Sequence, residues 1–277
     1  MRRQALLSPR HRALRKKRVV RFSVAFAAAV LSLCAAIVIF FNSGFVRVSS
    51  INVVSDDAVL GASVQSVIDN TVLGSYIGII PKNSALFFPF HSLDRAIRAQ
   101  FPAVASVSFS RHGLTGIQAT VRERQTAEIV CVASNDCYDA DAGGIIFKET
   151  ATTTGPYLIY ELTLPKGTQV IGLQFIDSGR LTDVSVFVAG LSKLGFSTDS
   201  ISVLPDRQYA FSLRGVSAQA SSTMKLFINE DRPFPLALQD FSAFWQTHLA
   251  SAAAGKEKPS LSSVDMRYGD NIIYKTR

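Results

Sequence analysis

The strongest pattern along the chain is an uncharged, mostly apolar run of twenty residues, Phe22–Phe41. At about 1.5 Å of rise per residue, twenty helical residues reach roughly 30 Å, the thickness of the hydrocarbon core of a bilayer. Backbone N–H and C=O groups find no other partners in hydrocarbon, so a single spanning segment has to be a helix. The pattern therefore predicts one transmembrane helix over residues 22–41.

The residues before this run form a basic tail over residues 1–21, with nine Lys or Arg and no acid. By the positive-inside rule, such a tail stays in the cytoplasm and the chain after the helix crosses the membrane. Its cations also attract the anionic headgroups of the lipid bilayer. We expect a single-pass type II protein of the inner (cytoplasmic) membrane, with an extracytoplasmic C-terminal part.

Two kinds of signal sequence are alternatives to an anchor. A cleaved signal peptide has a shorter apolar core of roughly 7–15 residues and a site of small residues, whereas Phe40-Phe41-Asn42 is bulky. A lipoprotein signal has a small residue before its cysteine, but Leu33 precedes Cys34 in the middle of the run. An uncleaved anchor is favoured, with Cys34 as a small apolar residue in lipid.

The charge of the whole chain comes from the tail. The chain has 29 Lys and Arg against 21 Asp and Glu. Without the nine cations of the tail, 20 remain against 21, a net charge of −1 for the rest. A nucleic-acid partner requires cations on a folded surface, so the sequence argues against one.

The patterns after the run predict two domains, over residues 45–124 and 125–277. Alternation predicts strands, and apolar residues three and four apart predict helices. In the first domain we expect strand Phe45–Val53, helix Val59–Thr71 capped by Ser63, loop Leu73–Pro89, helix Ser92–Gln100, and strands Val104–Ser110 and Leu114–Arg122. In the second we expect strands Thr126–Val132, Tyr157–Leu162, Gln169–Phe175, Ser200–Leu204, Gln208–Arg214 and Met224–Asn229, and helices Ser178–Leu194 and Leu236–Ser251.

Two cysteines, Cys131 and Cys137, flank a predicted turn between two strands. Opposed positions in a hairpin bring two sulfur atoms within bonding range, and an exported domain meets an oxidising environment. We expect a disulfide between them, the alternative being two free thiols. No His or further Cys lies near in the sequence, so a metal site is not expected there.

The first domain has the order β-α-α-β-β just outside a single anchor, which resembles a POTRA domain. Phe101–Arg111, with Pro102, Val104 and Val107, followed by Ile117–Arg124, resembles the FtsQ/DivIB family of bacterial cell-division proteins. Thr126 stands in place of a Pro that is usual in the family. The family also has a Pro in the hairpin, where this sequence has Gly113 and Leu114. These departures concern the stiffness of turns more than the fold.

The resemblance continues to the end of the chain. The stretch Tyr138–Phe147 is similar to the family's strand-Asp-x-x-Gly-x-x-Phe hairpin, and Val264-Asp265-Met266-Arg267-Tyr268 is similar to its terminal signature. The resemblance implies an α+β chain: a transmembrane helix, a POTRA domain, and a mixed β domain with a long sheet and flanking helices.

The resemblance also implies a partner-binding surface, because partner division proteins of the FtsB and FtsL type dock near the last strands in this family. Carried over to this sequence, it indicates Tyr268, Ile272, Ile273 and Tyr274 as partner-facing residues. Asp265 and Arg267 lie in the preceding strand and either face a partner or form a structural ion pair. A terminal strand can bind a partner by adding its strand at the sheet edge.

The sequence gives little support to an enzyme. Its four histidines have no metal-ligand spacing, and there is no Gly-x-Ser-x-Gly elbow or phosphate-binding glycine loop. A membrane-anchored hydrolase would need a catalytic group assembled from distant residues. We expect a non-enzymatic scaffold at the division septum that recruits or regulates septal wall synthesis, with no cofactor and no small-molecule substrate. The alternative is a POTRA-bearing secretion or envelope-assembly component.

Overall fold

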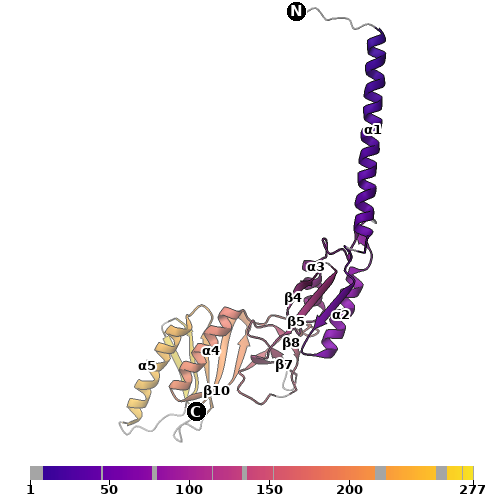
Figure 1. Cartoon of the computed structure of the whole chain (residues 1–277). Coiled ribbons are helices and arrows are strands. Elements are labelled where there is room, and N and C mark those ends of the chain that lie inside the picture. The colour runs from indigo at the N-terminus through magenta and orange to yellow at the C-terminus, as the bar shows by residue number, and fades with distance from the viewer. Residues whose placement is uncertain are drawn as a thin grey trace, which may run out of the picture. The chain divides into compact units, whose positions relative to one another are not determined.

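The structure is a computed structural model, which describes residues 9–44, 46–76, 80–113, 115–132, 136–151, 153–215, 223–253, 261–269 and 271–276. The chain divides into two compact units. The first unit comprises Met1–Arg98 and Ser106–Arg122, and the second comprises Ala99–Ala105 and Glu123–Arg277. Figure 1 shows both units, with the N-terminal helix in indigo.

Helix α1 (Pro9–Asn42) contains the uncharged run. Within the described part of the chain, it includes the one stretch, Arg18–Asn42, that is long and apolar enough to span a membrane or to act as a signal sequence. Its apolar side chains are exposed, as Phe22 (76%) and Phe26 (72%) illustrate. A helix that exposes apolar side chains all around is suited to lipid.

The first unit folds around a small mixed sheet with the strand order β1-β5-β4. Its elements after α1 are β1 (Ser50–Val54), α2 (Ala58–Val72), β2 (Ser75–Tyr76), β3 (Ile80–Pro81), α3 (Phe90–Gln100), β4 (Val104–His112) and β5 (Gly116–Glu123). Strands β1 and β5 are parallel. The predicted order of two helices between a first strand and a final pair is confirmed for the described residues.

Three local predictions for this unit were wrong. The first strand begins at Ser50, because Arg47 instead forms an isolated bridge with Ser84; Phe45 lies outside the described residues. Helix α2 is capped by Asp57, whose carboxylate accepts from the Val59 and Leu60 amides, and the Ser63 hydroxyl donates to the Val59 carbonyl inside the helix. An aspartate just before the first turn satisfies amides that have no partner within the helix. The predicted loop contains the two short strands β2 and β3.

The second unit is built on a sheet in which nine described strands have the order β14-β13-β12-β11-β10-β9-β6-β7-β8. The strands are β6 (Glu128–Cys131), β7 (Cys137–Ala140), β8 (Ile146–Glu149), β9 (Ile159–Leu162), β10 (Phe196–Leu204), β11 (Gln208–Gly215), β12 (Thr223–Asn229), β13 (Leu261–Tyr268) and β14 (Asn271–Thr276). Parallel pairs join β6 to β9, β9 to β10 and β12 to β13, and the other neighbours are antiparallel. The expected mixed α+β architecture with a long sheet is confirmed.

Two helices, α4 (Ser178–Lys193) and α5 (Phe234–Ala253), lie side by side on one face of this sheet (Figure 1). The Phe187 ring on α4 contacts Phe211 of β11 and Phe234 of α5, with centroid distances of 5.0 and 5.2 Å. The predicted stripe of α4 is buried at Leu181, Val184, Phe187, Val188 and Leu191. The core of the second unit therefore lies between these helices and the sheet.

The strand predicted over Gln169–Phe175 is absent, and Gln174 forms only an isolated bridge with Ile145. Gly172 has a φ of 93°, which interrupts an extended backbone. The segment still pairs with its neighbours, because the Gly172 amide donates to the Ile146 carbonyl and the Ile146 amide donates to the Leu173 carbonyl. Alternation of apolar residues alone did not reveal this turn.

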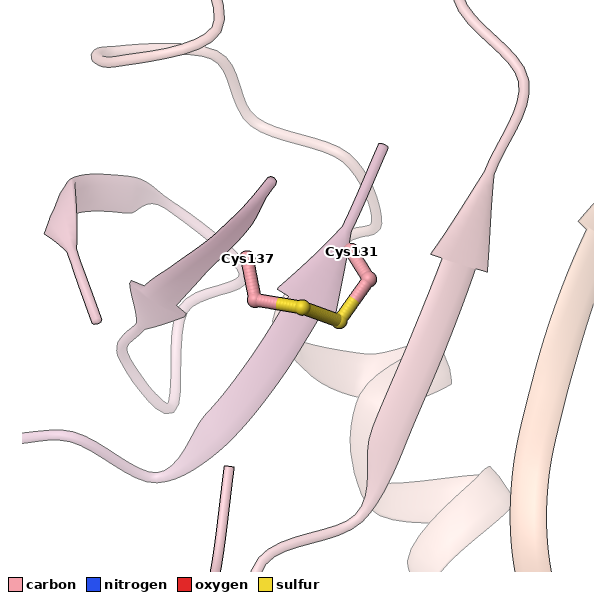
Figure 2. The surroundings of a disulfide bond; sticks show 2 residues. All are labelled: Cys131 and Cys137. Atoms are coloured by element: carbon pink, nitrogen blue, oxygen red, sulfur yellow. A yellow bond between two sulfur atoms is a disulfide. The ribbon is translucent and has the colours of Figure 1, made fainter. Parts of the chain in front are cut away.

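Cys131 and Cys137 form a disulfide between β6 and β7 (Figure 2). The two residues are direct partners in the antiparallel register, and their Cα atoms are 4.0 Å apart. The hairpin geometry thus brings the sulfur atoms together as the sequence pattern predicts. Cys34 is the cysteine outside this bridge.

Hydrogen bonds and an ion pair connect several polar groups near the start of this unit. The Arg124 side chain pairs with Asp141 and donates through Nε to the Pro102 carbonyl at 2.8 Å. The other Asp141 oxygen accepts from the Gly143 and Ile145 amides at 3.0 and 2.9 Å. These bonds hold the turn between β7 and β8.

Candidate functional site

The last strand of the chain, β14, forms one edge of the large sheet. It is paired with β13 along one side, in a register that sets Asp265 opposite Ile273 and Val264 opposite Tyr274. An edge strand presents backbone N–H and C=O groups on its outer side, which can pair with a strand from another chain. The predicted partner-facing residues Tyr268, Ile272, Ile273 and Tyr274 lie along this edge and its turn.

Side chains of β14 alternate between the two faces of the sheet. Tyr274 lies on the face covered by the helices, where its ring contacts Phe244 of α5 at a centroid distance of 5.5 Å. Ile272 packs partly against the core of the second unit, and 51% of Tyr274 remains exposed. On this face, α5 and β14 therefore form a continuous surface of apolar and aromatic side chains.

The opposite face of the edge carries Ile273, which is 50% exposed. Its neighbour across the pairing is Asp265, and Asp265 lies opposite Phe227 of β12. Ile273, Asp265 and Phe227 thus share one face. This face combines an apolar side chain at the edge with a charged group one strand further in.

Asp265 and Arg267 form an ion pair with two hydrogen bonds, from Nε at 2.8 Å and from Nη2 at 2.6 Å. The remaining Nη1 donates to Oε1 of Gln208 at 2.6 Å, and the guanidinium lies 4.9 Å from the centre of the Phe227 ring. Hydrogen bonding to Arg267 lowers the pKa of Asp265 below its usual value, and the same bonding raises the pKa of Arg267. The pair keeps both charges in place beside the edge strand.

The turn between β13 and β14 is held by a residue that the sequence did not indicate, Arg232. Its guanidinium donates to the Gly269 carbonyl and pairs with Asp240 of α5. Arg232 and Asp240 line a surface hollow of about 480 Å³, together with Leu236 and Arg267. Tyr268, the residue after Arg267 in the sequence, is 57% exposed.

Three residues of this site were not predicted from the sequence: Gln208, Phe227 and Arg232. Each contacts the terminal hairpin from a distant part of the chain; Gln208 is 59 residues from Arg267. No local motif marks them. Strand pairing brings Gln208 and Phe227 to the site, whereas Arg232 reaches it from the segment between β12 and α5. Lone polar or aromatic residues in strands otherwise give no signal of a partner surface.

The described residues hold no group of three or more His, Cys, Asp or Glu that could bind a metal ion. The most perturbed carboxyl lies elsewhere, on β6, where burial raises the pKa of Glu128 to about 7. Burial also raises the pKa of Tyr160 on the neighbouring β9. Strands β6 and β9 belong to the half of the sheet remote from β14, so these groups are not part of the candidate site.

No protein-family model matches the sequence, and no curated protein matches it.

Proposed function

We propose that this protein is a non-enzymatic scaffold of bacterial cell division, similar to FtsQ/DivIB proteins. Helix α1 would hold it in the cytoplasmic membrane as a single-pass type II protein, with the basic tail in the cytoplasm. The first unit would act as a POTRA domain and the second as the β domain of this family. The scaffold would recruit or regulate partners in septal wall synthesis at the division septum.

The observation that carries the proposal is the edge strand β14 with its half-exposed Ile273 and Tyr274. The edge offers main-chain groups for strand addition, and the side chains on its two faces give specificity. The resemblance of Val264–Tyr268 to the family's terminal signature supports this edge as the site for partners of the FtsB and FtsL type. The protein would then act through its position and contacts, with no chemistry of its own.

A fluorescent fusion of the full chain tests the cellular role. A band at midcell and a septation defect on depletion are the expected results. Uniform membrane label with normal septation on depletion would contradict the proposal and favour a POTRA-bearing secretion or envelope-assembly component.

The edge itself is tested by proline at Ile272. Asn271 pairs with Tyr268 across a two-residue turn, and such a closing pair is hydrogen-bonded, so we expect the Ile272 amide to point outward. Ile272→Pro removes this donor at an edge, where proline is tolerated. We expect binding of an FtsB- or FtsL-type partner to weaken about ten-fold, as for loss of one hydrogen bond.

Ile272→Val is the matched control, because it keeps the amide and a β-branched side chain. The intrinsic fluorescence of Trp245 reports whether the second unit stays folded, since this ring packs on Phe196 at 4.8 Å. Unchanged partner affinity in a folded Ile272→Pro variant would move the interface away from β14.

A further inference from the structure

Two neighbouring apolar side chains project from the segment before α3. Leu86 is 58% exposed and Phe87 is 50% exposed, whereas Ala85 and Phe88 on either side are buried. The surrounding stretch Asn83–Phe90 contains no charged residue. The buried flanking residues fix the backbone, so the two exposed side chains form a small, ordered apolar tip.

The backbone hydrogen bonds tie this tip to the chain that leaves α1. The Ala85 amide donates to the Val46 carbonyl at 2.8 Å, and the Val48 amide donates to the Asn83 carbonyl at 2.8 Å. Val46 is four residues after Asn42, the last residue of α1. Four extended residues span at most about 14 Å, so the tip stays near the end of α1 whatever the tilt of the helix.

Aromatic packing continues the apolar surface of α1 onto the tip. The rings of Phe41 and Phe87 are in contact, with a centroid distance of 5.4 Å. Phe41 is the last residue of the uncharged run, and the preceding Phe40 is 53% exposed. The contact between Phe41 and Phe87 thus joins the apolar side chains of α1 to those of the tip. Arg47 lies beside this junction, where its Nη2 donates to Oδ1 of Asn42 at 2.8 Å, and a cation there is suited to the level of the lipid headgroups.

We propose that Leu86 and Phe87 insert into the interfacial region of the membrane leaflet where α1 ends, as a second membrane contact of the first unit. This inference rests on the proposed anchoring of α1 in a membrane. Aromatic and apolar side chains are favoured at the boundary between headgroups and acyl chains. Continuity with the spanning helix identifies lipid as the occupant of this surface, and the contact would restrict how far the first unit can tilt from the membrane.

Site-specific fluorescence of the full chain tests the insertion. In a Cys34→Ser background, Leu86→Cys and Phe87→Cys are labelled without reductant with an environment-sensitive nitrobenzoxadiazole dye. The chain is reconstituted in vesicles of phosphatidylcholine and phosphatidylglycerol. Val59→Cys is the matched control, an equally apolar and 76% exposed position on α2 of the same unit. The background chain without an added cysteine controls for labelling at Cys131 and Cys137.

We expect lipids with a doxyl group near the headgroup to quench the dye at positions 86 and 87 about two-fold more than at position 59, and aqueous iodide to do the reverse. Equal quenching at all three positions, in a chain that floats with the vesicles, would overturn the insertion and leave the anchoring intact. Protection from iodide without quenching by doxyl lipid would indicate a protein surface instead and would also overturn it. A chain that fails to float with the vesicles would refute the anchoring and the insertion together.

Discussion

The Arg267 guanidinium donates two hydrogen bonds to the carboxylate of Asp265, which lies two positions earlier on the same strand, β13. Residues two apart on a regular strand share a face, and the register of β13 shifts between Asp265 and Tyr268. With Gln208 and Phe227 as further partners, Arg267 connects β11, β12 and β13 beside the edge strand. The pair is therefore structural in the isolated chain, and it also orders the surface next to β14.

Arg267→Lys should destabilise the second unit, because an ammonium group cannot make the bidentate contact or stack on Phe227. We expect the free energy of unfolding to fall by about 1–2 kcal/mol. Urea unfolding of the full chain in detergent, followed by the fluorescence of Trp245, measures this. Arg214→Lys is the control, because the Arg214–Asp199 pair is more exposed and should contribute little. Equal losses in both variants would refute the special role of Arg267.

The disulfide should stabilise the hairpin of β6 and β7. On the chain-entropy estimate, closing so short a loop contributes roughly 2 kcal/mol. Replacing both Cys131 and Cys137 by Ser should lower the free energy of unfolding by about that amount, while Cys34→Ser should leave it unchanged. Mass spectrometry without reductant should find the two thiols linked; complete alkylation of both would contradict the bridge.

The elements that the sequence predicted well are those with a long periodic pattern. Helices α4 and α5 begin and end within two residues of the predicted limits, because their apolar stripes pack on the same sheet face. The Asp57 cap and the turn at Gly172 were missed, since both depend on one residue's backbone conformation and not on a period. For the site, the terminal hairpin was expected from the resemblance of its residues to a family signature. Phe227 reaches it through the pairing of β12 with β13, and Arg232 reaches it from the segment between β12 and α5, so neither could be assigned from the local sequence.

The pKa of Glu128 predicts a pH dependence of stability. Burial raises this pKa from 4.5 to about 7, so the folded state binds the proton more tightly than the unfolded state. The contribution of this group to stability is therefore greatest below about pH 4.5 and declines as the pH rises to about 7, above which Glu128 is ionised in both states. We expect Glu128→Gln to remove this decline and to stabilise the chain by about 1–2 kcal/mol at pH 8, because the amide oxygen can still accept from the Leu158 amide.

Urea unfolding at a series of pH values compares Glu128→Gln with Glu149→Gln, which makes the same change at an exposed position of β8. Only the first variant should flatten the profile between pH 4.5 and 7. If the free energy of unfolding varied with pH in the same way in the parent chain and in Glu128→Gln, the ionisation of Glu128 would not lower the stability of the folded state, and the prediction would be wrong.

Gly144 should be the least replaceable glycine of the turn between β7 and β8. Its φ is +76°, and a Cβ atom at this position would lie 2.1 Å from the backbone oxygen of Ile176. Gly144→Ala therefore combines a left-handed backbone with a clash against the main chain, and we expect it to lower the free energy of unfolding by about 2–4 kcal/mol.

The adjacent Gly143→Ala is the matched control, since a Cβ atom there would lie 3.2 Å from Oδ1 of Asp141, a side-chain atom that can shift. Because the Gly144 turn also orients Asp141 toward Arg124, hydrogen exchange of the Gly143 and Ile145 amides should accelerate in Gly144→Ala beyond its effect on β14. Uniform acceleration across the second unit would mean that the substitution acts by global destabilisation and not through this turn.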